Sequence, residues 1–170
     1  MRAQHEQEFS EYADARWPVL VRAAVVLGCS LEEAQDLAQT TLLRCLRAWT
    51  RVRAADDRDA YVYTVLLNAH RDSHRRRWRG ERPTAEVPDS HVADRSAEVD
   101  LTDAVHRALA DLSADHRAVV VLRHLAGLDE RRTAEVLGVA PGTVKSRLSR
   151  AMDRLSASTH LADLAPREQS

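Results

Sequence analysis

The stretch ERRTAEVLGVAPGTVKSRLSRAMDRL, residues 130–155, decides the fold of the C-terminal part of this 170-residue chain. It predicts two short helices around a tight turn, because Gly138 suits a helix end and Pro141 suits a first helical position. The second helix has an apolar stripe at helical spacing, formed by Val144, Leu148, Ala151, Met152 and Leu155. Two short helices around such a turn are typical of a helix-turn-helix motif.

The polar face of that second helix carries side chains suited to the major groove of DNA. In a recognition helix the apolar side anchors the helix, and hydrogen-bonding side chains contact base edges and phosphates. The candidates here are Thr143, Lys145, Ser146, Arg147 and Arg150. An amphipathic hairpin whose charged face meets only solvent is the alternative that spacing leaves open.

Helical periodicity before this motif predicts an all-α fold. Apolar residues recur every three or four positions over residues 8–27, 31–49 and 59–78. Pro18 predicts a kink or a break in the first of these helices. Residues 50–59 are polar and are expected to form a loop.

Two shorter features bear on helix boundaries. Ser30 and Glu33 have the spacing of a capping box, and Ser113 is an expected N-cap. Residues 118–122, AVVVL, suit a buried strand by β-branching. A helix is preferred there because no second strand could pair with this one.

The net charge of −1 hides an uneven distribution of charge. Residues 51–79 and 123–170 carry eight basic side chains each, whereas residues 80–122 carry nine acidic and four basic ones. Within the acidic part, residues 80–99 lack periodicity and contain two prolines, which predicts a flexible linker. This layout indicates two nucleic-acid-facing pieces, although the net charge alone argues against DNA binding.

The basic residues of the first piece gather in HRDSHRRRWRG, residues 70–80. Arginines beside Trp78 suit the phosphates and bases of single-stranded or distorted nucleic acid, whereas a solvated charged face is the alternative. His70 and His74 have a spacing that can bind zinc, but no third ligand has an evident position. No metal site is therefore predicted.

Several classes of protein are excluded or disfavoured. The chain has no P-loop, GxSxG, HExxH or GxGxxG motif, so neither an enzyme nor a bound cofactor is predicted. Cys29 and Cys45 have no CxxC spacing and are expected to be small core residues. No apolar run approaches a membrane span, and the N-terminus lacks the apolar core of a signal peptide, so a cytoplasmic protein without membrane insertion is predicted.

The basic cluster is followed along the chain by the helix-turn-helix, and this order resembles the sigma factors of bacterial RNA polymerase. The resemblance is to the compact extracytoplasmic-function class of these factors. EEAQDLAQTTLLRCLRAW (32–49) resembles the polymerase-binding helix of sigma region 2, and AYVYTVLLNAHRDSHRRRWR (60–79) resembles the helix that melts and reads the −10 element. Residues 112–155 resemble region 4, which binds the −35 element. ARWPVLVRAA and LLNAHRD are similar to an actinobacterial subgroup.

The resemblance implies two small helical domains on a tether. Region 2 would occupy residues 8–79, the flexible acidic linker 80–99 and region 4 residues 100–156, with a polar tail at 157–170. The implied function is to bind core RNA polymerase and direct promoter-specific initiation. The implied partners are the clamp helices of the largest catalytic subunit, the β flap, promoter DNA and an anti-sigma factor.

The resemblance also implies roles for individual residues. Asp36 and Gln39, with Leu42 and Leu43 nearby, would contact the clamp helices. Asn68 would read an extruded −10 base in a pocket formed by residues 51–59. The backbone beside that base would be held by Arg71, Arg75, Arg76 and Arg77. The −35 duplex would be met by Thr143, Lys145, Ser146, Arg147 and Arg150.

Some alternatives stay open at this point. Tyr61, Tyr63 and Trp78 are candidates for base stacking, but the two tyrosines suit the region 2 core equally well. A stand-alone helix-turn-helix regulator would explain residues 130–155 and leave Asp36 and Gln39 without a role. An adaptor that binds only a protein partner is the third hypothesis.

Three positions depart from the family pattern. Ala140 stands where many relatives have a capping residue, so the recognition helix is expected to lack an N-cap, worth about 1 kcal/mol. Arg131 and Arg132 replace a pair that is commonly less basic. The two arginines would add a contact to a DNA phosphate or change how the protein is regulated.

Overall fold

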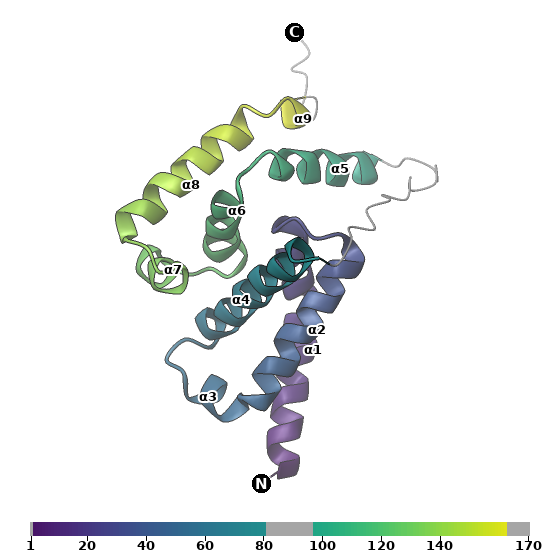
Figure 1. Ribbon diagram of the computed structural model, residues 1–170, viewed down its shortest axis with the longest axis vertical. Coiled ribbons are helices and arrows are strands. Elements are labelled where there is room, and N and C mark those ends of the chain that lie inside the picture. The colour runs from purple at the N-terminus through teal and green to yellow at the C-terminus, as the bar shows by residue number, and fades with distance from the viewer. Residues whose placement is uncertain (1, 81–96, 163–170) are drawn as a thin grey trace.

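The computed structural model describes residues 2–80 and 97–162, which form helices and connecting turns with no strand among them. The N-terminal module consists of α1 (Arg2–Val26), α2 (Leu31–Arg47), α3 (Trp49–Ala54) and α4 (Arg58–Trp78) (Figure 1). The C-terminal module consists of α5 (Ala97–Ala110), α6 (Ala114–Val120), the π-helical turn η1 (Val121–Leu125), α7 (Glu130–Leu137), α8 (Pro141–Ser156) and α9 (Thr159–Ala162). The predicted all-α fold is confirmed.

Helix α1 runs through Pro18 without a break, so the prediction of a break is wrong. A proline lacks the N–H that the carbonyl of Asp14 would accept from in a regular helix. Both residues are exposed, so water can hydrate that carbonyl. Hydration of this carbonyl offsets part of the lost hydrogen bond, and the helix continues.

The expected loop at residues 50–59 is also corrected, because its first part belongs to α3. Trp49 and Val52 are one helical turn apart and both buried, at 6% and 0% exposure, so burial of this pair stabilises a short helix. Phe9 meets the Trp49 indole edge-on, with ring centroids 5.2 Å apart. The spacing of Trp49 and Val52 in the sequence could have indicated this helix, although residues 50–59 are mostly polar.

Two boundaries near the linker and the tail differ from the prediction. Helix α5 begins at Ala97, so the last positions of the expected 80–99 linker are helical, and residues 81–96 lie outside the described part. Helix α9 occupies Thr159–Ala162 within the expected tail. Residues 118–122 are helical, as preferred, and the helix widens into η1 from Val121.

Side-chain caps fix the starts of several helices. The Ser30 hydroxyl accepts from the backbone N–H of Glu33 at 3.3 Å, and the Glu33 carboxylate accepts from the Ser30 N–H at 2.8 Å. Asp57 caps α4 by accepting from Ala60 N–H at 2.9 Å, and Ser113 caps α6. The predicted capping box and the Ser113 cap are therefore confirmed.

The recognition helix α8 begins without such a cap. Gly138 ends α7 in the left-handed conformation at φ 66°, which favours glycine, and Pro141 occupies the first turn of α8. Ala140, at the N-cap position, has extended backbone angles and makes no side-chain bond. The expected absence of a cap is confirmed.

Ala140→Ser should therefore stabilise the C-terminal module. A hydroxyl at this position can accept from a backbone N–H in the first turn of α8, a gain of about 0.5–2 kcal/mol. Thermal or urea unfolding of the two forms measures the difference. Ala157→Ser, at the opposite end of α8, is the control and should leave the free energy of unfolding nearly unchanged.

The two modules are in contact through a shared apolar core. Leu66 and Val62 of α4 are buried at 0% and 1% exposure, and they belong to the same cluster as Val121 and Leu122 of η1, both at 0%. Helix α7 packs along α4, and η1 packs against α1. The C-terminal module therefore lies directly on the N-terminal one.

Candidate nucleic-acid and polymerase interface

The exposed face of α2 presents the residues expected to bind polymerase. Asp36 and Gln39 are exposed, and Leu43 is an exposed apolar side chain at 50%. Leu42 is only 8% exposed and belongs to the core of the N-terminal module. The structure thus brings three of the four residues to one accessible surface and leaves Leu42 beneath it.

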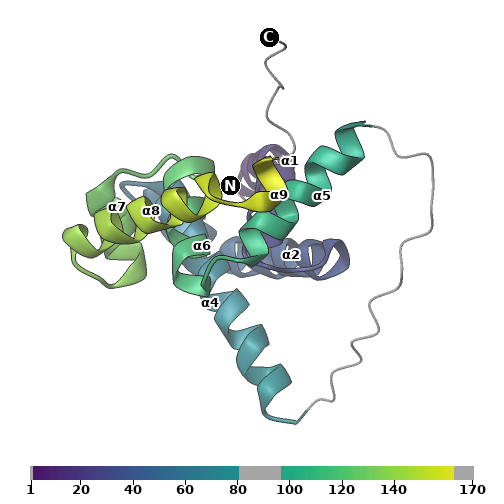
Figure 2. The ribbon, with the colours of Figure 1, turned by 90° about the horizontal axis from the view of Figure 1, so that it is seen from above.

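The expected −10 residues follow one another along the second half of α4. Asn68 and all four predicted arginines are exposed. In Figure 2 the C-terminal half of α4 projects from the body of the molecule, which leaves its basic end accessible from several sides. Asn68 and Arg71 line a cavity of about 890 Å³, whose other walls include Leu27 of α1–α2 and Ala114 of α6.

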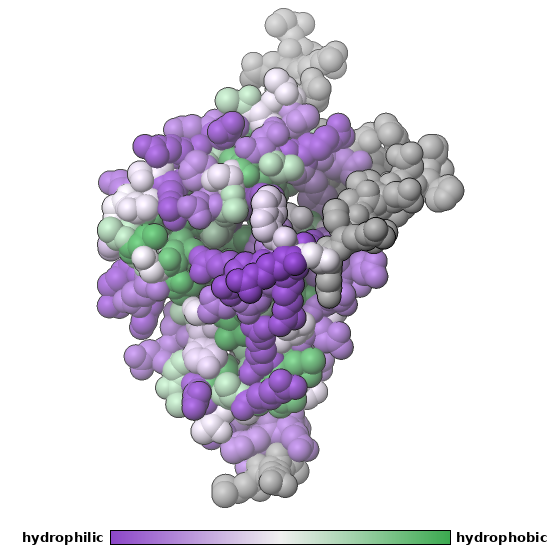
Figure 3. Space-filling view, in the orientation of Figure 1, coloured by the Kyte–Doolittle hydropathy of each residue, from purple (hydrophilic) through white to green (hydrophobic). Residues whose placement is uncertain are grey.

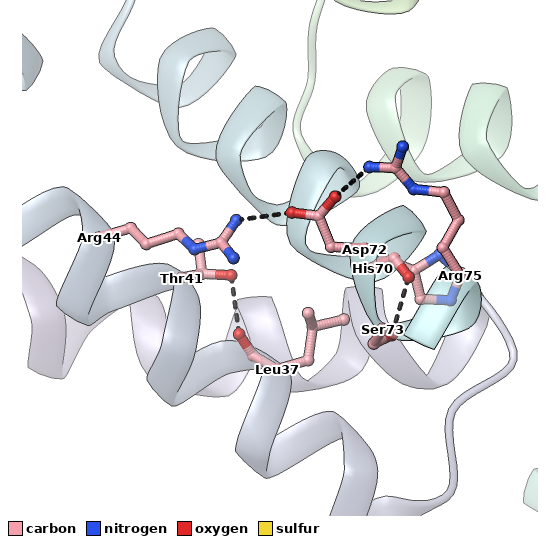
Figure 4. A network of polar contacts seen from close by, with 7 residues as sticks. All are labelled: Leu37, Thr41, Arg44, His70, Asp72, Ser73 and Arg75. Carbon is pink, nitrogen blue, oxygen red and sulfur yellow. Dashed lines mark hydrogen bonds and ion pairs between the residues drawn. The ribbon is translucent and has the colours of Figure 1, made fainter. Parts of the chain in front are cut away.

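Carboxylates hold two of these four arginines, Arg75 and Arg77, in place. Asp72 accepts from Arg75 at 2.5 Å and from Arg44 of α2 at 3.3 Å, so it joins the two helices (Figure 4). The hydrogen bond from Arg75, with help from Arg44, lowers the pKa of Asp72, and the carboxylate stays ionised at neutral pH. Arg77 pairs with Glu33 of α2 at 2.6 Å.

The same contacts explain how Glu33 serves both a helix cap and an ion pair. The backbone N–H of Ser30 is the main cause that lowers the pKa of Glu33, and Arg77 adds to it. Asp72 was not singled out from the sequence, and Glu33 was predicted only as part of the capping box. Arg44, which pairs with Asp72, and Arg77, which pairs with Glu33, lie on another helix than their partners, so no local spacing could have revealed these two pairs.

The two histidines of α4 form a close pair. Their Nε2 atoms are 3.2 Å apart, so one ring donates to the other. Burial, followed by the charges of His74, Arg117, Arg77 and Arg71, lowers the pKa of His70 to about 4, so His70 is neutral at pH 7. No group of three or more metal-ligating side chains occurs among the described residues.

The three aromatic candidates for stacking on bases have different surroundings. Tyr63 is 3% exposed and packs in the core of the N-terminal module, and Tyr61 packs partly against the same core. Burial raises the pKa of Tyr63 to about 12. Trp78 is 94% exposed at the end of α4, so it is the aromatic ring accessible for stacking.

The polar face of α8 is arranged as the helix-turn-helix predicted. Lys145, Ser146 and Arg150 are exposed, while Val144 and Ala151 on the opposite side are fully buried. Val144 packs in a small core with Val119 and Ala134, which anchors α8 on α6 and α7. Figure 3 shows that the face of the molecule seen in Figure 1 is mostly hydrophilic, with smaller apolar patches.

One residue of this face already has a protein partner. Arg147 is half-buried and pairs with Asp115 of α6 at 2.7 Å. Thr143 is also half-buried, and its carbonyl accepts from the Ser146 hydroxyl at 3.1 Å. The guanidinium of Arg147 must therefore exchange a carboxylate for DNA if it is to bind the −35 element.

Comparison with known protein families matches both modules. A family model described as sigma-70 region 2 matches residues 14–80, and one described as sigma-70 region 4 matches residues 102–155. No described helix is long and apolar enough to cross a membrane.

Individual relatives agree with these matches. The RNA polymerase sigma-E factor of Streptomyces avermitilis is 36% identical over 160 residues, which cover 94% of this chain and 89% of that protein. The ECF RNA polymerase sigma factor SigM of Mycobacterium tuberculosis is 38% identical over 138 residues, or 81% of this chain and 69% of that protein.

Solved structures show the same likeness. The sigma factor RpoE of Bartonella quintana, in complex with the anti-sigma factor NepR, matches with a TM-score of 0.68 and 30% identity over 88% of this chain and 95% of that one. CnrH, in complex with the cytosolic domain of CnrY, matches with a TM-score of 0.66 and 26% identity over 96% of this chain and 95% of that one. The chain belongs to the extracytoplasmic-function sigma factors of bacterial RNA polymerase.

Proposed function

We propose that this sigma factor divides promoter recognition between its modules. The N-terminal module, residues 8–79, docks on the polymerase clamp helices through the exposed face of α2 and takes the melted −10 strand along α4. The C-terminal module, residues 100–156, binds the −35 duplex through α8 and meets the β flap. Residues 80–99 connect the two.

The observation that carries this proposal is the position of the accessible polar residues. They gather on three helices, and the apolar sides of the same helices form the cores. On α4, Asn68 lies one turn before Arg71 and two turns before Arg75, a spacing that places a base-reading amide beside arginines for the adjacent phosphates. On α8, Lys145 and Arg150 are exposed beside the buried anchor Val144.

The chain contributes recognition and no catalytic chemistry in this proposal. The polymerase forms the phosphodiester bonds, and the sigma factor supplies the energy that offsets base extrusion, a few kcal/mol for each unstacked base. It acts in the cytoplasm, where polymerase and promoter DNA meet. An anti-sigma factor is a further proposed partner, since RpoE and CnrH were each solved as complexes.

Binding to core polymerase is the first test. The double variant Asp36→Ala/Gln39→Ala should lose at least about tenfold in affinity for core enzyme, because an interface often depends on a few central contacts. Gln4→Ala/Glu6→Ala is the control: it removes the same kinds of side chain from exposed positions on α1 and should leave the affinity unchanged. Affinity is measured by titrating a labelled chain with core enzyme.

Run-off transcription with core enzyme on a pool of genomic fragments distinguishes the alternatives. Promoter-dependent transcripts support the sigma factor proposal, and their sequencing gives the −10 and −35 sequences. Absence of core binding by the unaltered chain refutes the proposal and favours a stand-alone regulator. Core binding without any transcript favours an adaptor.

A further inference from the structure

The cavity of about 890 Å³ beside α4 has a lining that suits a small ligand. Its walls come from three places in the chain: Asn68 and Arg71 lie on α4, Arg117 lies on α6, and Leu27 and Gly28 precede α2. Sites for small molecules in proteins have volumes of about 300–1,000 Å³. The cavity is therefore large enough for a ligand of the size of a nucleotide.

The charged side chains of this cavity are mostly cationic. The lining has three arginines, Arg71, Arg75 and Arg117, and one carboxylate, Asp72. That carboxylate already accepts from Arg75 at 2.5 Å, and from Arg44 outside the lining at 3.3 Å (Figure 4). The cavity therefore has an excess of positive charge that its own carboxylate does not neutralise.

Two of the three arginines have no acidic partner in the chain. Neither Arg71 nor Arg117 forms an ion pair with any carboxylate whose side chain the structure describes. The Nε atom of Arg117 is buried, and none of the described groups accepts its hydrogen bond. A buried charged donor without an acceptor destabilises a structure. An anion in the cavity would supply the missing acceptor.

The glycine at the turn between α1 and α2 gives Arg117 its place beside the cavity. Gly28 has φ 106°, a conformation that side-chain-bearing residues rarely adopt. A β-carbon at this position would lie 2.5 Å from the Nη1 atom of Arg117. The guanidinium therefore packs over a position that only glycine leaves open.

The state of His70 also indicates positive charge at this cavity. Burial, followed by the charges of His74, Arg117, Arg77 and Arg71, lowers the pKa of His70 to about 4. The ring is thus neutral at pH 7, and three nearby guanidinium groups disfavour a further proton on it. The same charges would stabilise a bound anion.

Phosphate is the anion that matches these side chains best. A guanidinium can donate two parallel N–H groups to phosphate oxygens, which gives strong and directional hydrogen bonds. Arg71 and Arg117 come from different helices, so each can bind a separate phosphate group, and Asn68 offers a further N–H donor. The volume of the cavity leaves room for both groups.

We propose that this cavity binds a small molecule with a diphosphate group, which is held between Arg71 of α4 and Arg117 of α6. Inorganic pyrophosphate and the diphosphate of a nucleotide share this chemistry. Arg117 has no part in the proposed contacts with promoter DNA. The inference therefore goes beyond the proposed function and does not require it.

Calorimetric titration of the full chain with pyrophosphate tests the site. Arg71→Gln and Arg117→Gln should each weaken binding at least about tenfold, because each removes charge-assisted hydrogen bonds. Arg107→Gln is the matched control, since Arg107 is exposed on α5 and does not line the cavity. It should bind as the unaltered chain does. Circular dichroism establishes that every variant is folded.

Titration with ADP distinguishes the two sources of the diphosphate group. Binding of ADP at least about tenfold tighter than that of pyrophosphate identifies a nucleotide as the ligand, because the rest of the molecule then adds contacts. Equal affinities identify the diphosphate group itself. Two results would overturn the inference: no binding of either compound by the unaltered chain, or equal weakening by Arg107→Gln and Arg117→Gln.

A competition arm separates this inference from the proposed function, since Asn68 and Arg71 belong to both sites. Saturating pyrophosphate at constant ionic strength should weaken binding of a labelled single strand, with the −10 sequence found by run-off sequencing, at least about threefold. Arg117→Gln should show no such loss. If calorimetry shows the site but the strand still binds equally well, the assignment of Asn68 to the −10 strand fails and the diphosphate site stands.

Discussion

Leu43→Ala should weaken binding to core polymerase by about 1–2 kcal/mol, or about 5- to 30-fold, with almost no change in stability. The side chain is 50% exposed on the α2 face beside Gln39, so truncation removes apolar surface that a partner can cover. Leu42→Ala should instead lower the stability of the chain and leave polymerase binding by the folded protein nearly unchanged. Its side chain is buried in the module core, and the lost burial and the resulting cavity cost about 2–4 kcal/mol of the free energy of unfolding.

The two leucines serve as controls for each other. They are adjacent, carry the same side chain and undergo the same substitution, so only their surroundings differ. Urea unfolding measures stability, and titration with core enzyme measures affinity at a temperature where both variants are folded. A stable Leu42→Ala variant with impaired polymerase binding would show that α2 presents a different face to the enzyme.

The helix-turn-helix could be predicted in detail because its signals are local. Gly138 ends one helix, Pro141 begins the next, and the stripe that includes Val144 repeats at helical spacing. Ser30 and Glu33 are also close in sequence, and their capping box forms as predicted. Contacts within one turn of helix are decided by residues that a local pattern can reveal.

The contacts between helices could not be predicted in this way. Asp72 binds Arg44, which is 28 residues earlier in the chain, and Asp115 binds Arg147 in another helix. The packing of η1 on α4 likewise depends on surfaces that come together only after both modules have formed. A charge layout indicated two nucleic-acid-binding pieces, but it could not show that the pieces lie against each other.

Pro18 and Trp49 show how tertiary context overrides local preference. The proline predicted a kink or a break, yet the helix continues through it at a place where Asp14 and Pro18 are both exposed. The polar sequence after Trp49 predicted a loop, yet burial of that indole against Phe9 and Tyr12 holds a helix there. The exposure of Pro18 and the burial of Trp49 decided these two outcomes, and neither can be read from a single sequence.

Arg147→Ala should reduce −35-dependent transcription by about 1–3 kcal/mol, or about 5- to 150-fold. Its partly exposed ion pair with Asp115 is worth about 1 kcal/mol, so the free energy of unfolding should change little. Arg154→Ala is the control, because it removes the same side chain from an exposed position in the last turn of α8. It should leave transcription close to the unaltered level.

A panel of −35 sequences then distinguishes the kind of contact that Arg147 makes. A loss confined to certain base substitutions identifies a base contact, whereas an equal loss on every sequence identifies a phosphate contact. Asp115→Asn should increase −35 affinity modestly, about two- to fivefold, because the guanidinium no longer has to leave a carboxylate and one negative charge near the DNA is removed. Asp153→Asn is the control, because it makes the same charge change on α8 and leaves the Arg147–Asp115 pair intact. An equal gain in affinity from Asp153→Asn would show that net charge, and not the release of Arg147, controls −35 binding.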